Sequence, residues 1–72
     1  MTRPLRELDV VALTADEPRL GLYAGQVGTI VDMLDEGVYD VEFVWPNGET
    51  YAMATLREDQ LLLLRYEPVA TA

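Results

Sequence analysis

Turn-forming residues interrupt this chain so often that no segment of ten or more residues keeps a helical spacing of apolar side chains. Glycine, proline and an Asn-Gly pair separate short stretches rich in valine, leucine and tyrosine, which are typical of β-strands. A chain of 72 residues has room for one domain with a small core. The sequence therefore predicts a single all-β domain.

Five strands are expected in this domain. They cover residues 8–13, 27–34, 38 to 44 or 45, about 49–54 and 61–66. The second strand begins beside Gly28, which suggests a bulge or a close backbone approach. The last strand is apolar on both faces, so it either closes a barrel or meets another subunit.

The residues between these strands predict how the strands are connected. Residues 14–26 form a long loop pinned to the core by Leu20 and Leu22, since its proline and glycines exclude a helix. Gly37 and the Asn-Gly pair mark two tight turns. Residues 56–60 are predicted to form one helical turn, capped by Thr55. This arrangement is typical of a small five-stranded SH3-like barrel with a long early loop and one helical turn before the last strand.

The domain is expected to span residues 8–66, between an N-terminal segment of residues 1–7 and a C-terminal tail of residues 67–72. The first residues contain no apolar run long enough for a signal peptide or a membrane span. Cysteine is absent, which makes a small secreted scaffold improbable. A cytoplasmic location is therefore the expectation.

Histidine, cysteine, lysine and serine are all missing from the chain. Their absence removes the usual general bases near neutral pH, the thiol and serine nucleophiles, and the imidazole and thiolate metal ligands. A carboxylate pair that cleaves a glycoside needs a deep cleft, which a chain of this size scarcely provides. The sequence therefore predicts a protein that is not an enzyme and that uses no metal or other cofactor.

Acidic residues dominate the middle of the chain. The formal net charge is −8, and no basic residue lies among the six acids between Asp32 and Glu49. One interpretation is a solvated strand face that keeps a small protein soluble. The alternative is a docking surface for a basic partner.

The stretch "YDVEFVWPNGETY", residues 39–51, places these acids on a strand. Tyr39 and Phe43 share one face and are predicted to lie in the core, whereas Asp40 and Glu42 point the other way. Val44 shares the acidic face, which suggests a contact surface there. The only tryptophan follows at the end of this strand, either as a lid over the core or as an exposed anchor.

The segment Gly-x-Val-Gly-Thr-Ile-Val of residues 25–31 is followed by a Tyr-x-Val-Glu-Phe pattern at residues 39–43. Together these motifs resemble a family of short bacterial proteins catalogued only as a domain of unknown function. The similarity runs over residues 8–64, and its most specific part is the Gly-x-Val-Gly-Thr-Ile-Val segment that ends at Val31. It implies an SH3-like barrel in a cytoplasmic bacterial protein without an established activity. The Trp45-Pro46 pair departs from the family's usual pattern.

Residues 25–30 are also similar, more weakly, to the KOW segment of ribosomal and transcription-factor barrels. Those modules carry lysines and arginines around the glycines, as phosphate contact requires. This segment has neither. The shared glycines indicate a common backbone requirement.

The leading functional hypothesis is a non-catalytic module whose acidic hairpin docks a basic protein, with an antitoxin-like or immunity-like role as one version. A second hypothesis is a homo-oligomer that associates through the last strand. A third is a KOW-like nucleic-acid-binding barrel, against which the net charge argues, because it repels phosphate groups. The residues predicted to contact the protein partner are Asp35, Glu36, Asp40, Glu42, Val44, Trp45 and Glu49.

Overall fold

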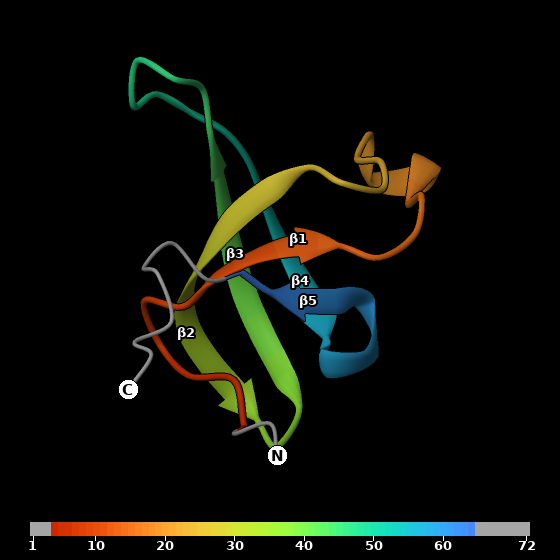
Figure 1. Cartoon of the computed structure of the whole chain (residues 1–72), viewed down its shortest axis with the longest axis vertical. Helices are drawn as coiled ribbons and strands as arrows, with labels where there is room; N and C mark the ends of the chain where they lie inside the picture. Colours follow the sequence, from red (N-terminus) through yellow and green to blue (C-terminus); the bar gives the residue numbers. More distant parts are fainter. Residues whose placement is uncertain (1–3, 65–72) are drawn as a thin grey trace, which may run out of the picture.

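The computed structural model describes residues 4–64, which form one antiparallel sheet of five strands in the order β4-β3-β2-β1-β5 (Figure 1). The strands are β1 (Val10–Leu13), β2 (Val27–Asp35), β3 (Val38–Val44), β4 (Thr50–Arg57) and β5 (Leu61–Leu63). The helical elements of the described part are two 3-10 turns, η1 (Pro18–Leu20) and η2 (Glu58–Gln60). The prediction of an all-β fold with five strands is confirmed.

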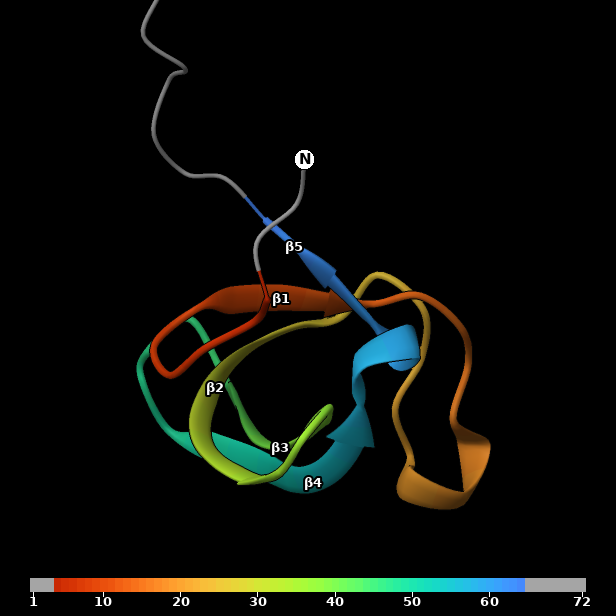
Figure 2. The same ribbon diagram turned by 90° about the horizontal axis from the view of Figure 1, so that it is seen from below.

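The sheet is curved but open. β4 and β5 lie at its two edges, and the other strands wrap around the core when the sheet is viewed end-on (Figure 2). Three β-bulges contribute to the bending, because each adds one unpaired residue and increases the local twist. The extra residues are Val31 and Leu34 in β2 and Tyr51 in β4.

The alternation of β3 builds the centre of the core. Tyr39, Val41 and Phe43 point inward and are buried, as the pattern of the sequence predicts for the two aromatic residues. The other buried apolar side chains of the core cluster are Leu5, Val11, Leu13, Leu22, Ile30, Ala54, Leu56 and Leu61. The core thus draws on every strand of the sheet and on the segment before β1.

The first strand begins two residues later than predicted, because the chain turns immediately before it. Leu8 adopts a positive φ of 71°, and the Asp9 N–H donates a hydrogen bond to the carbonyl of Arg6 at 3.1 Å. This turn keeps residues 8 and 9 out of β1.

The fourth strand is longer than predicted and shortens the helical turn that follows. β4 continues to Arg57, so Thr55 lies within the strand and its predicted role as a helix cap is wrong. The Arg57 N–H instead bonds to Oε1 of Gln60 at 2.8 Å at the start of η2. The predicted helical turn before the last strand is present in this shorter form.

The long loop between β1 and β2 is partly anchored. Leu22 is buried as predicted, whereas Leu20 is exposed, so its predicted contact with the core is wrong. The Glu17 N–H donates to the Leu22 carbonyl at 2.8 Å and closes the loop on itself around η1.

Some predictions concern residues outside the described part of the chain. These are Arg65 and Tyr66 of the predicted last strand, the predicted tail of residues 67–72, and residues 1–3 of the predicted N-terminal segment. Within residues 4–64, no helix has the length and apolar character needed to cross a membrane.

Gly28 of β2 lies in close contact with the neighbouring strand β3. This glycine is buried. A Cβ atom added to it would lie 2.6 Å from Cγ1 of Val41 and 2.9 Å from the carbonyl oxygen of Glu42. No side chain larger than hydrogen fits against β3 at this position. The close backbone approach predicted for this glycine is confirmed.

We therefore expect Gly28→Ala to lower the free energy of unfolding by about 2–3 kcal/mol, because the added methyl group overpacks the core. Urea denaturation measures the change. Thr29→Ala is the control, since the neighbouring side chain lies on the opposite face, and it should cost under about 1 kcal/mol.

A double-mutant cycle with Val41→Ala tests the cause. Removing the Val41 methyl groups relieves the shortest of the three close contacts, so the combined loss should be smaller than the sum of the single losses. A Gly28→Ala protein as stable as the wild type would contradict this account.

Candidate functional site

The outer face of β3 carries the acidic residues that the sequence places away from the core. Asp40 lies directly between Asp32 of β2 and Thr55 of β4. Glu42 lies between Thr29 and Met53 of the same two strands. We call Asp32, Asp40 and Glu42 the carboxylate face.

Threonine hydroxyl groups orient the two carboxylates of β3. Thr55 Oγ1 donates to Asp40 Oδ1 at 2.7 Å, and Thr50 Oγ1 donates to Glu42 Oε2 at 2.5 Å. The nearest arginine along β4, Arg57, pairs instead with Asp59 at 3.2 Å. Within residues 4–64, no arginine forms an ion pair with the carboxylate face.

The carboxylate face opposes local stability. Asp32 and Asp40 are direct cross-strand partners, and like charges at such positions destabilise a sheet. A substitution that removes one of these charges would relieve the repulsion. The arrangement therefore has a cost that the fold itself does not require.

Trp45 extends beyond the end of β3 on the other side of the hairpin. Its ring centroid lies 4.5 Å from that of Tyr51, which in turn lies 6.2 Å from that of buried Phe43. Trp45 is nevertheless 56% exposed. The residue is therefore both a partial lid over the end of the core and an exposed apolar side chain.

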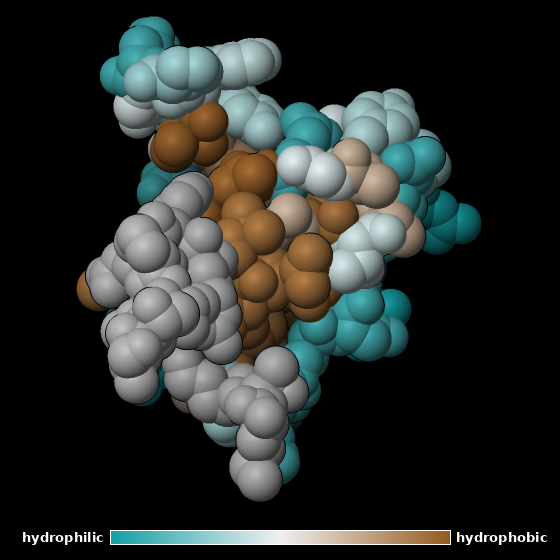
Figure 3. All heavy atoms as spheres, viewed as in Figure 1, coloured by the Kyte–Doolittle hydropathy of each residue, from teal (hydrophilic) through white to brown (hydrophobic). Residues whose placement is uncertain are grey.

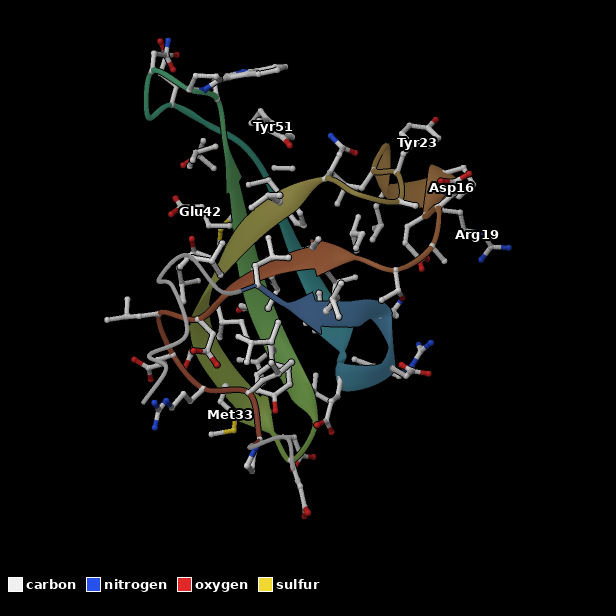
Figure 4. All side chains as sticks on the ribbon, viewed as in Figure 1. Asp16, Arg19, Tyr23, Met33, Glu42 and Tyr51 are labelled. Atoms are coloured by element: carbon white, nitrogen blue, oxygen red, sulfur yellow. The ribbon has the colours of Figure 1, made fainter. Side chains whose placement is uncertain are left out.

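The two sides of the hairpin are clearly separated. Glu42 and Tyr51 point in opposite directions from β3 and β4 in Figure 4. The bulge at Tyr51 turns this residue toward the core side, where it meets Trp45.

Gln26 connects this aromatic pair to the long loop. Its Nε2 donates to the hydroxyl oxygen of Tyr51 at 3.1 Å, and its Oε1 accepts from the N–H of Tyr23 at 2.6 Å. Tyr23 is exposed, whereas Tyr51 is half-buried against the core.

The seven residues predicted to contact the partner do not form one surface. Asp35 and Glu36 lie at the turn between β2 and β3, and Trp45 and Glu49 lie at the opposite end of β3. The seven residues of β3 span about 20 Å between these ends. Asp40, Glu42 and Val44 occupy the outer face between them, so the structure divides the prediction into two ends and one face.

Met53 is a surface residue that the sequence reasoning missed. It lies opposite Glu42 and is 56% exposed. The alternation of Met53 with Ala52 and Ala54 was the available signal, because it places the methionine on the outer face once the register of β4 is known.

A groove of about 690 Å³ lies elsewhere, between the segment before β1 and strand β5. Leu5, Met33 and Leu62 contribute apolar surface, and Glu36 and Glu58 contribute carboxylates. Tyr39 also borders the groove and donates a long hydrogen bond of 3.4 Å from its hydroxyl to the carbonyl of Leu5.

Burial raises the pKa of the Tyr39 phenol, and the nearby charges of Glu58, Asp9 and Glu36 raise it further. Of the tyrosines in residues 4–64, Tyr39 is the one whose ring is buried, and three carboxylates lie near its hydroxyl group. Within residues 4–64, the acidic side chains also form no group of three or more that suits a metal ion.

Comparison with known proteins gives one finding. The family model described as "Domain of unknown function (DUF4926)" matches residues 7–63. The chain belongs to the DUF4926 family. No curated protein and no solved structure matches the chain. The DUF4926 match covers all five strands, the carboxylate face and Trp45, and it confirms the predicted resemblance to a family of unknown function.

The raised pKa of Tyr39 predicts how stability depends on pH. A folded-state pKa above the unfolded value of about 10 stabilises the protein below that pH, and the contribution is lost as the pH rises further. The chain contains no lysine or cysteine, so few other side chains titrate in this range. We expect Tyr39→Phe to cost about 1 kcal/mol or less at pH 7 and to reduce the loss of stability above pH 10.

Chemical denaturation between pH 7 and pH 11 measures both effects. Tyr23→Phe, which removes an exposed phenol, is the matched control and should follow the wild-type pH dependence. Identical alkaline profiles for Tyr39→Phe and the wild type would contradict the assignment.

Proposed function

We propose that this chain is a non-catalytic protein-binding module that docks a basic protein partner. The carboxylate face is the observation that supports it. Asp40 and Glu42 stand on an open sheet face beside Asp32, oriented by threonine hydroxyls and without an arginine partner in the described part. Such a face attracts a cationic surface and steers its approach.

The energetic cost of this face is a second argument. Asp32 and Asp40 oppose each other across two strands, although like-charge pairs lower stability. Departures from locally favourable choices are typical of functional sites. A basic partner would convert the repulsion into attraction.

Apolar side chains beside the carboxylates would add contact energy to the electrostatic steering. Val44 and Met53 are exposed on the same outer face. Trp45 offers a rigid aromatic anchor at the end of the hairpin, since one side of its ring rests on Tyr51. Interfaces commonly combine such an anchor with a charged rim.

The finer assignments belong to the same proposal. The five-stranded order, the long loop after β1 and the 3-10 turn before β5 support an SH3-like barrel. A cytoplasmic antitoxin-like or immunity-like protein that neutralises a basic effector is the biological version that suits a small domain of charge −8. The residue inventory, without histidine, cysteine, lysine or serine, supports a binding role in place of catalysis.

Reversing the charges of Asp40 and Glu42 tests the proposal. We expect D40K/E42K to remain folded, because both side chains lie on the outer face and a lysine at position 40 would face Asp32. Capture of basic proteins from a native lysate, quantified by mass spectrometry at low and moderate salt, should fall at least about tenfold.

The double variant E7K/E58K is the matched control. It changes the formal net charge equally, from −8 to −4, at exposed positions outside the strands: Glu7 precedes β1 and Glu58 begins η2, so neither belongs to the carboxylate face. It should retain the captured proteins. Equal capture by D40K/E42K and the wild type would refute docking through the carboxylate face.

The homo-oligomer remains a second candidate, and one observation favours it. Leu62 is 57% exposed on the edge strand β5, and apolar surface covers the region of β1 and β5 in Figure 3. If β5 mediates association, the mass in solution should rise with protein concentration, and Leu62→Glu should abolish the rise. A monomer at all concentrations up to about the millimolar range would exclude this candidate.

A further inference from the structure

The edge of β4 presents unpaired backbone groups. β4 pairs with β3 on one side only. The Glu58 N–H bonds to the carbonyl of Gly37, which fixes the alternation of the ladder. The backbones of Ala52, Ala54 and Leu56 face β3, whereas those of Met53, Thr55 and Arg57 face outward.

Two of these three residues, Met53 and Thr55, have backbone groups that form no hydrogen bond within residues 4–64. The Arg57 N–H is taken by Oε1 of Gln60. Within residues 4–64, the N–H and C=O groups of Met53 and Thr55 bond to no other group. Both residues are therefore ready to pair with an additional strand.

The sequence of β4 does not protect this edge. Natural edge strands are commonly blocked by charges, proline, bulges or short length. Residues 50–56 contain no charge, proline or glycine, although a quarter of the chain is charged. β4 has eight residues, against three in the other edge strand, β5. Its bulge at Tyr51 affects only one end.

The free edge of β4 is accessible from both faces of the hairpin, and each face carries one part of the candidate site. The carboxylate face and the Trp45–Tyr51 pair lie on opposite sides of the hairpin, so no flat surface can touch both. An extended segment along β4 can, because its alternate side chains point to opposite faces. One set would lie beside Met53 and Thr55, and the other beside Ala52 and Ala54.

We propose that a basic protein partner binds by adding an extended segment to the free edge of β4 as a sixth strand, antiparallel to β4. The segment alternates arginine or lysine with apolar residues. Its basic side chains extend over β4 toward Asp40 and Glu42, about two strand spacings or 10 Å away. Its apolar side chains face the core side, near the aromatic pair. This mode rests on the proposed function and specifies how that partner is held.

Charge favours this occupant over a second copy of the chain. Pairing of β4 with another β4 would place two copies of Asp40 and Glu42 on one continuous face, in proteins that each carry a formal charge of −8. Like-charge juxtaposition opposes that assembly. A basic strand at the same edge neutralises the face.

A synthetic peptide of five Arg-Val repeats, with both ends blocked, is the probe. Residues that pair directly across an antiparallel ladder share a face. The arginines opposite Met53 and Thr55 therefore point their own amides at β4, whereas the valine amides point away. N-methylation of the arginines should weaken binding at least about tenfold, because the ladder hydrogen bonds are lost while the charge is kept. N-methylation of the valines is the matched control and should change affinity less than about threefold.

Protein variants give the reciprocal test. Met53→Pro removes the outward N–H without touching a bond to β3, so peptide affinity should also fall at least about tenfold. Met53→Ala keeps the backbone donor and is its control. Amide hydrogen exchange on the wild type should show slower exchange at Met53 and Thr55 when the peptide is added. This measurement and the two methylated peptides decide the question even if Met53→Pro does not fold.

The outcomes separate this inference from the proposed function. If D40K/E42K loses the peptide but both methylated peptides bind the wild type equally, the acidic face binds basic segments and strand addition is overturned. If D40K/E42K binds as well as the wild type, the proposed function fails. Protection of Met53 and Thr55 that rises with protein concentration, without peptide, would assign the edge to a second copy. A wild-type protein that binds none of the peptides would also overturn strand addition.

Discussion

The close approach of Gly28 to β3 is the contact on which the rest of the sheet depends. Gly28 pairs with Val11 of β1 on one side and lies against Val41 and Phe43 of β3. Without a side chain at this position, β2 can lie close to both neighbours while the sheet bends around its core. The bulges then carry the bend along β2. A chain of 72 residues gains a closely packed centre in this way.

The alternation of side chains along β3 determines which residues lie in the core and which lie on the outer face. The inward residues of β3 fill the core, and the same two-residue period must therefore send Asp40 and Glu42 outward. A register shift of one residue would bury both carboxylates, so the core strongly specifies the position of the acidic face. The stability of the core and the exposure of the candidate site are consequences of one alternation.

Local pattern was sufficient to predict much of this from the sequence. The strands, the tight turns at Gly37 and Gly48, and the burial of Tyr39 and Phe43 all follow from neighbouring residues. The bulges do not, because the residues inserted at Val31 and Leu34 are ordinary strand formers. The end of β4 was missed for a related reason: Thr55 resembles a helix cap, and its pairing with Asp40 depends on a strand fifteen residues earlier.

The arrangement of the candidate site also depends on contacts between distant residues, so local sequence pattern could not predict it. The predicted contact residues lie within one short part of the sequence, residues 35–49, but the structure distributes them over the two ends and the outer face of β3. The free edge is invisible in the sequence, since β4 becomes an edge only because β1 pairs with β2 and β5, through contacts such as Val11 with Leu63. A row of carboxylates on β3 and an uncharged strand beside it are each common features. Their adjacency at an open edge supports the proposal of a recognition surface over that of a solvated face, because the edge offers directional backbone hydrogen bonds next to the charge.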